Sequence, residues 1–381
     1  MKLFGQKQTG FSAIFGVVLI SVVLAACGNS STGGGTTGNS TAPVNGKNCT
    51  KVGVLLPETA TSARWDSKDK PLLTNDIQAI PGVKVDYYNA EGDATTQQNQ
   101  ADTALTKGDC ILVVAASDSA SAATIVTKAK AKQIPVIAYD RLIQSKDLNY
   151  YVSFDNVKVG ELQAQYIIDH YKDFVKSGTP NVVMINGAQT DNNAILFRQG
   201  ALNKLQPMFD NGTFKKVYDQ YTPNWDNDTA RTEMDGALVA QQGKGDVQIA
   251  YVANDGMANS VIAALKAKQL NGKVLVTGQD ATVAGIQNIL VGDQSMTVYK
   301  AIDKEAQATA NLVKALHDGT STASLTNGAV TKTQDGGSIP SILETPVAVD
   351  KTNIASTVIA DNFVTVAEIC QNLPKGTGGI C

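Results

Sequence analysis

The chain has few of the residues that commonly carry catalysis or bind metal ions. It contains two histidines, His170 and His317, and its five cysteines form no CxxC pair, which disfavours a zinc site. The GxSxG, GxxxxGKS/T and HExxH motifs of hydrolases, nucleotide-binding proteins and metalloproteases are absent. We therefore expect a protein without catalytic residues, cofactor or metal.

Excess charge and aromatic residues are also scarce. The 32 Lys and Arg nearly balance the 35 Asp and Glu, for a net charge of -3, and 6% of residues are aromatic. Nucleic-acid-binding domains usually carry a clustered basic face. We find no such patch and expect no nucleic-acid partner.

The apolar run Phe11–Ala26 is shorter than the roughly 18 residues expected of a membrane-spanning helix. A basic segment precedes it and the letters LAAC end it, a pattern typical of a bacterial lipoprotein signal. We predict that residues 1–26 are a signal peptide and that Cys27 is lipidated. Residues 27–48 are almost wholly Gly, Ser, Thr and Asn, so we expect a flexible linker that tethers the protein to the membrane.

The remaining four cysteines suggest disulfides, because their number is even and the chain is expected to be exported. Three connectivities are open to them. Cys49 and Cys110 each precede an apolar strand-like run, so neighbouring parallel strands would bring them together. Cys370 and Cys381 are close in sequence. We predict the pairs Cys49–Cys110 and Cys370–Cys381.

From Cys49 onward, about 330 residues remain, which suits two lobes better than one core. Short β-branched runs alternate with helical stretches, which predicts right-handed βαβ units and parallel sheets. The expected strands are 52–56, 83–88, 111–115 and 134–138 in the first half, and 182–185, 216–218, 247–251 and 274–277 in the second. The predicted fold class is α/β, with two Rossmann-like lobes.

The lobes are expected to exchange segments through short crossings near 155, 281 and 301, which would form a hinge. The predicted bounds are 49–154 plus about 281–301 for the N-terminal lobe, 155–280 plus about 302–370 for the C-terminal lobe, and 371–381 for a tail.

Polar and aromatic side chains follow the predicted strands. Asp140 and Arg141 end the stretch IPVIAYDR, and ligands of open α/β sheets bind beyond the carboxyl ends of strands. Taken singly, such residues are explained as helix caps, packing residues or surface ion pairs. Their recurrence in both halves favours a polyhydroxylated ligand, because carboxylates, amides and guanidinium groups bind hydroxyls while aromatic rings cover C–H faces. Further examples are Arg64, Trp65, Asn192, Asn193, Phe197, Arg198, Trp225, Asn254, Asp255, Gln279 and Asp280.

The segments ARWDSKD, IPVIAYDR, YVSFDNVKVGELQA, DNNAILFRQG, NGKVLVTGQDA and MTVYK closely resemble those of the periplasmic D-xylose-binding proteins of ABC importers. The resemblance runs from about residue 51 to about 363. It implies a type I periplasmic binding protein fold that closes on one monosaccharide, and partners in a membrane permease and its ATPase.

The same resemblance implies which residues touch the sugar. Direct contacts are expected from Arg64, Trp65, Asp140, Arg141, Asn193, Arg198, Asp255 and Asp280, with support from Phe197, Trp225 and Lys300. The sequence departs from the family after Trp225, where Thr229 stands at a position that is usually Asn. Thr has one hydroxyl in place of an amide, which leaves the choice of sugar open.

We expect a monomeric, lipid-anchored receptor for D-xylose, on the outer face of the cytoplasmic membrane or in the periplasm if there are two membranes. The alternatives are a receptor for glucose, arabinose or ribose, and a sugar sensor for chemotaxis or two-component signalling. A sugar-responsive transcription regulator shares this fold, but it would need a helix-turn-helix head where this chain has a lipobox and linker.

Overall fold

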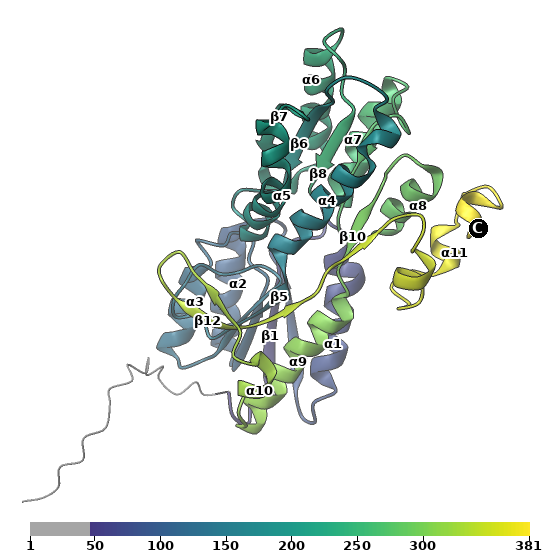
Figure 1. Cartoon of the computed structure of the whole chain (residues 1–381). Coiled ribbons are helices and arrows are strands. Elements are labelled where there is room, and N and C mark those ends of the chain that lie inside the picture. The colour runs from purple at the N-terminus through teal and green to yellow at the C-terminus, as the bar shows by residue number, and fades with distance from the viewer. Residues whose placement is uncertain (1–45) are drawn as a thin grey trace, which may run out of the picture. The chain divides into compact units, whose positions relative to one another are not determined.

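The computed structural model describes residues 46–381 (Figure 1). The predicted signal peptide, Cys27 and most of the predicted linker lie outside the described residues. None of the helices within 46–381 combines the length and apolar character needed to cross a membrane.

Seven strands form the sheet of the first lobe, in the order β11-β12-β5-β4-β3-β1-β2. Neighbouring strands pair in parallel, except that β11 is antiparallel to β12. The central strands are apolar runs without exposed residues, as expected when helices cover both faces of a parallel sheet. The bounds are β1 Lys51–Leu56, β2 Lys84–Asn89, β3 Ile111–Val114, β4 Val136–Tyr139, β5 Tyr150–Phe154, β11 Val330–Lys332 and β12 Ser338–Glu344.

Helices cover both faces of this sheet. The helices α1 (Lys70–Gln78) and α9 (Ile302–Asp318) share one apolar core with the sheet, and α2 (Ala94–Lys107) and α3 (Ala123–Ala131) share the other. The short α10 (Ala323–Thr326) follows α9.

The second lobe is built on a four-stranded parallel sheet in the order β7-β6-β8-β9. One large apolar core joins this sheet to its helices. The bounds are α4 Asn156–Phe174, β6 Asn181–Asn186, α5 Asn192–Asp210, β7 Lys215–Tyr221, α6 Asn227–Gln241, β8 Ile249–Val252, α7 Asp255–Ala267 and β9 Leu275–Val276.

Two glycines let α4 and α5 touch backbone to backbone. A Cβ atom at Gly160 would overlap the carbonyl oxygen of Phe197, and one at Gly200 would overlap that of Val157. Helices that approach this closely are fixed in register against each other. The contact therefore sets the position of α5, whose first turns carry Asn193 and Phe197.

A smaller part of the second lobe follows β9. It contains a two-stranded antiparallel ribbon and short helices around a separate apolar core. In Figure 1, α8 and α11 lie together at the C-terminal end of the chain. The bounds are α8 Val283–Val291, β10 Thr297–Tyr299, β13 Val347–Val349, a π-helix Ala355–Ile359, α11 Val366–Ile369 and a 3₁₀ turn Thr377–Gly379.

The chain passes between the lobes three times: from β5 to α4, from β10 to α9, and from β12 to β13. The predicted crossings near 155 and 301 agree with this path, but the third lies near 345 and not near 281. The predicted division of the second half is therefore wrong. Residues 281–301 pack with the second lobe, while 302–344 join the first lobe, because α9 packs on α1 and β12 pairs with β5.

Both predicted disulfides are confirmed. Cys49 precedes β1 and Cys110 precedes the adjacent β3, and their Cα atoms are 5.5 Å apart. Cys370 pairs with Cys381 at a Cα separation of 5.3 Å.

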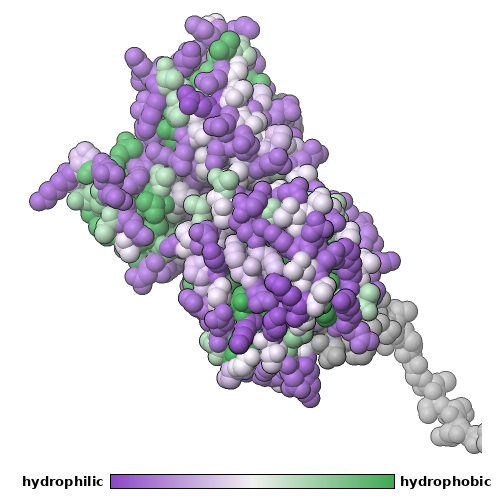
Figure 2. All heavy atoms as spheres, turned by 180° about the vertical axis from the view of Figure 1, so that it is seen from behind, coloured by the Kyte–Doolittle hydropathy of each residue, from purple (hydrophilic) through white to green (hydrophobic). Residues whose placement is uncertain are grey.

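The surface is mainly polar. The face shown in Figure 2 is mostly hydrophilic, with hydrophobic residues gathered in small areas. The large hydrophobic side chains exposed among residues 46–381 are Val239, Val291, Val330, Leu343, Val347 and Val366.

Candidate functional site

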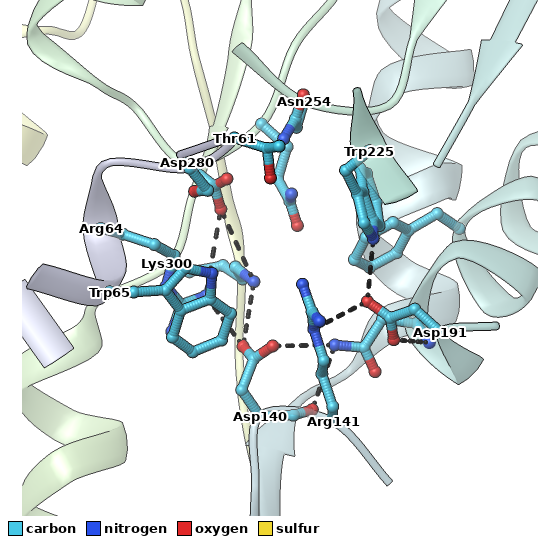
Figure 3. A pocket seen from close by; sticks show the side chains of 14 residues that line it. Thr61, Arg64, Trp65, Asp140, Arg141, Asp191, Trp225, Asn254, Asp280 and Lys300 are labelled. Carbon is cyan, nitrogen blue, oxygen red and sulfur yellow. Dashed lines mark hydrogen bonds and ion pairs between the residues drawn. The ribbon is translucent and has the colours of Figure 1, made fainter. Parts of the chain in front are cut away.

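A cavity lies where the carboxyl ends of the strands of both sheets meet, and we call it the inner cavity. It encloses about 320 Å³ of empty space, part of it open to solvent. Figure 3 shows its polar side chains pointing toward one another from both lobes. The lining residues are Thr61, Ser62, Arg64, Trp65, Asp140, Arg141, Asp191, Asn193, Phe197, Trp225, Asn254, Gln279, Asp280 and Lys300.

Arg64 is held by three carboxylates. It precedes a π-helix, Trp65–Asp69, and its Nε and Nη2 donate to the two carboxylate oxygens of Asp69 at 2.8 and 2.6 Å. Nη2 also donates to Glu305 Oε2 at 3.1 Å, and Nη1 donates to Asp140 Oδ2 at 2.8 Å. Burial opposes the charge of this guanidinium, but Asp140 and Asp69 outweigh burial and raise its pKa well above the ordinary value.

Asp140 is the central acceptor of the inner cavity. Its Oδ2 accepts from Arg64 and from Lys300 Nζ, the latter at 3.2 Å, and its Oδ1 accepts from Asn193 Nδ2 at 2.9 Å. Burial alone would raise the pKa of this carboxyl, but the charges of Arg64 and Lys300 outweigh burial and lower the pKa, so the carboxylate is ionised.

The backbone at Asp140 is left-handed, with φ of 57°, which is uncommon for a residue with a side chain. Its carbonyl oxygen accepts from Ser153 Oγ at 2.7 Å, Tyr151 Oη at 3.1 Å and Asn193 Nδ2 at 3.1 Å. These bonds hold a strained turn that aims the carboxylate into the cavity, an arrangement common at functional sites.

Arg141 and Asp191 form an ion pair between the lobes. Arg141 Nε donates to Asp191 Oδ2 at 2.9 Å, and its Nη1 donates to the Ala116 carbonyl at 3.2 Å. Asp191 caps α5 through Asn193 N and also accepts from Trp225 Nε1 at 3.2 Å. Burial raises the pKa of Asp191, and Arg141 works against that rise.

Two indole rings line the inner cavity. The guanidinium carbons of Arg64 and Arg141 lie 4.6 and 5.1 Å from the centre of the Trp65 ring, within range of cation–π attraction. Trp225 ends a 3₁₀ turn, Pro223–Trp225, and has φ of 58°. Its ring packs on Gly187, where a Cβ atom would overlap the indole.

Three buried polar atoms of the cavity wall have no hydrogen-bond partner: Trp65 Nε1, Gln279 Oε1 and Asp280 Oδ1. Asp280 Oδ1 lies 3.6 Å from Lys300 Nζ and 4.0 Å from Arg64 Nη1, beyond hydrogen-bond length. Buried polar groups are nearly always paired, so these atoms point to a ligand that supplies both donors and acceptors.

The periplasmic binding protein domain family matches residues 53–321. The chain belongs to this family. It is 37% identical over 322 residues to the D-xylose-binding periplasmic protein of Escherichia coli K12, which covers 84% of this chain and 92% of that protein. It is 36% identical over 325 residues to the multiple sugar-binding periplasmic receptor ChvE of Rhizobium radiobacter, covering 82% and 90%.

A solved ABC transporter solute-binding protein from Clostridium phytofermentans, with bound β-D-glucose, superposes with a TM-score of 0.74 at 31% identity, covering 84% of this chain and 99% of that one. This periplasmic binding protein therefore has the type I fold, and it is a binding protein and not an enzyme.

Most of the predicted contact residues of this binding protein line the inner cavity, but Arg198 and Asp255 do not. Arg198, on α5, points away from the cavity, and its Nε and Nη2 donate to the carboxylate of Asp219 at 2.9 and 2.6 Å. Asp255 is buried in the second lobe, where its carboxylate accepts from Gln294 and Thr297. Burial raises the pKa of Asp255 to about 7.

Five lining residues of the binding protein are absent from the predicted contact set: Thr61, Ser62, Asp191, Asn254 and Gln279. Asn254 and Gln279 precede Asp255 and Asp280 at strand ends. Of the first dipeptide only Asn254 lines the cavity, whereas both members of the second dipeptide line it. The position of Asp191 just before a predicted helix indicates a helix cap and nothing more. Thr229, on which sugar choice was expected to depend, lies in the first turn of α6 and is not a lining residue.

Proposed function

We propose that this protein is the substrate-binding component of an ABC sugar importer and that it binds one neutral monosaccharide, D-xylose first among the candidates, in the inner cavity. The observation that carries the proposal is a cavity lined by two tryptophans at the meeting point of both sheets, in whose wall one donor and two acceptors are unpaired. Sugar hydroxyls donate and accept, and the C–H faces of a pyranose suit an indole ring.

The charge of the cavity wall supports a neutral ligand. Three cationic side chains face three carboxylates in the lining, so neither sign is in excess: Arg64, Arg141 and Lys300 against Asp140, Asp191 and Asp280. Arg64 is further neutralised from behind by Asp69 and Glu305. A sugar acid would bring a charge that no free cation of this wall balances.

The contacts are divided between the lobes, which supports closure around the ligand. Asp140 and Arg141 belong to the first lobe, while their partners Asn193 and Asp191 belong to the second. A ligand that bonds to both lobes favours the closed arrangement by its differential affinity. The three crossings would serve as the hinge.

The identity of the bound sugar is tested by isothermal titration calorimetry with D-xylose, D-glucose, L-arabinose and D-ribose. Relatives of similar identity bind, by name, D-xylose or multiple sugars, so the panel separates a specific receptor from a broad one. Binding of none of these sugars would contradict the proposal.

Two arginines give a matched pair of variants. Arg141→Lys loses the fork that contacts Asp191 and Ala116, and we expect the affinity for the best sugar to fall at least tenfold. Arg198→Lys removes a similar fork from Asp219 outside the cavity and should leave the affinity within twofold. Equal effects of the two variants would place the sugar elsewhere.

We further propose that the exported protein is anchored through a lipid on Cys27 and hands its sugar to a permease driven by a separate ATPase. Radiolabelled palmitate should be incorporated into the wild-type protein and not into the Cys27→Ala variant. Labelling of both or of neither would contradict the anchor.

A further inference from the structure

A second cavity adjoins the inner cavity, and we call it the outer chamber. Four residues line both spaces: Thr61, Arg141, Asp191 and Trp225. The outer chamber encloses about 700 Å³ of empty space, part of it open to solvent. Measured in the same way, the outer chamber is about twice the size of the inner cavity, so it leaves space for a further chemical group.

The outer chamber lies on the side of the cleft away from the crossings. Its wall is built from the segments after β1, β2, β3 and β4 in the first lobe and after β6 and β7 in the second. The edge strands β2 and β7 bound this side, whereas the crossings leave from β5, β10 and β12. A substituent on a sugar in the inner cavity can therefore extend into the outer chamber without meeting the hinge.

The lining of the outer chamber suits a hydroxylated, uncharged group. Glu58 and Glu91 add two carboxylates to the shared Asp191, against the single cation of Arg141. Ser117 offers a hydroxyl oxygen that has no hydrogen-bond partner in the structure. This acidic balance disfavours a phosphate or a uronic acid and leaves acceptors for hydroxyl groups.

The wall shared by the two spaces is firmly held. Glu58 accepts from the backbone N and the hydroxyl of Thr61 at 2.7 and 3.0 Å, which fixes the loop between the two spaces. On the opposite side, Asp191 holds the Trp225 indole. The boundary between the two spaces is thus formed by residues that are bonded in place.

We propose that the cleft binds neutral glycosides, with one sugar ring in the inner cavity and a second sugar unit in the outer chamber. This inference rests on the proposed function, because the first ring must occupy the inner cavity.

Calorimetry with the full protein tests the inference. D-xylose and D-glucose are compared with xylobiose, cellobiose and maltose. We expect at least one disaccharide to bind within tenfold of its own monosaccharide. If a monosaccharide binds and every disaccharide is weaker by more than tenfold, the inference is overturned while the proposed function stands. If no sugar binds, both fail.

A space-filling substitution locates the second unit. Ala60 is exposed and lines only the outer chamber. Ala60→Trp should weaken disaccharide binding at least tenfold and monosaccharide binding less than twofold. Val239→Trp, on α6 and 64% exposed, is the control and should change neither. Equal effects of Ala60→Trp on both ligands, or no effect on either, would overturn the inference.

Discussion

Replacing Arg64 with methionine should strongly destabilise the fold, because its guanidinium is the shared partner of three buried carboxylates. The arginine side chain is 4% exposed, and the acids are Asp69, Asp140 and Glu305. Breaking a buried ion pair costs about 3–5 kcal/mol, since the remaining charge stays buried without a partner. Lys300 remains beside Asp140 and partly compensates its charge. We therefore expect the free energy of unfolding to fall by about 3–5 kcal/mol, as for the loss of one ion pair and not of three.

The loss of stability in Arg64→Met should be smaller at acid pH than at neutral pH. Arg64 is the largest of the charges that lower the pKa of Asp140 in the folded protein. A carboxyl with a lowered pKa stabilises the fold above its unfolded pKa of about 3.9, and that stability is lost as the pH falls through the folded pKa. The difference in the free energy of unfolding between wild type and Arg64→Met should therefore be larger at pH 7 than at pH 3, which lies below the unfolded pKa.

Urea unfolding followed by circular dichroism at pH 3 and pH 7 measures both effects. Arg198→Met is the control, because its ion pair with Asp219 is partly exposed and should contribute about 1 kcal/mol or less. The reasoning is refuted if Arg64→Met unfolds within 1 kcal/mol of wild type at pH 7. A difference that is the same at both pH values would refute the assignment to Asp140.

Three further changes are predicted. Gly187→Ala should displace the Trp225 indole and weaken sugar binding at least tenfold in calorimetry, and unchanged affinity would contradict the packing. Asp255 has its pKa raised to about 7. Its stabilisation is therefore complete below about pH 4 and lost as the pH rises through about 7, by up to about 4 kcal/mol, and Asp255→Asn should flatten that slope in urea titrations. Removing the Cys49–Cys110 disulfide with a double alanine variant should cost about 4 kcal/mol, given the loop of 61 residues, as read from the urea midpoint.

The α/β class and both sheets could be predicted from the sequence, because β-branched runs and amphipathic helices alternate at short range. The assignment of the residues after 281 to the two lobes could not be predicted, since it depends on β12 pairing with β5 across almost two hundred residues. Local pattern carries no information about such pairing. The hairpin of β11 and β12 is partly exposed and lacks a continuous apolar run, so it gave no strand signal either.

At the site, strand ends were predictable because parallel strands direct their carboxyl ends to one edge. Which member of the dipeptide 254–255 faces the cavity could not be predicted. Asn254 caps α7 and reaches the cavity, whereas Asp255 begins the helix and turns into the lobe. Arg198 follows Phe197 by one position, about 100° around α5, which takes it to the Asp219 side of the helix.

The late return of the chain to the first sheet has a consequence for biosynthesis. The segment 302–344 supplies α9, which covers the apolar face of α1, and β12, which closes one edge of the sheet. A nascent chain that has emerged only as far as β10 thus lacks a finished first domain, although all of β1 to β5 is present. Pairings of this sequence separation form slowly. The amino-terminal half is therefore a poor candidate for expression as a fragment, and translocation must be almost complete before either half can reach its final fold.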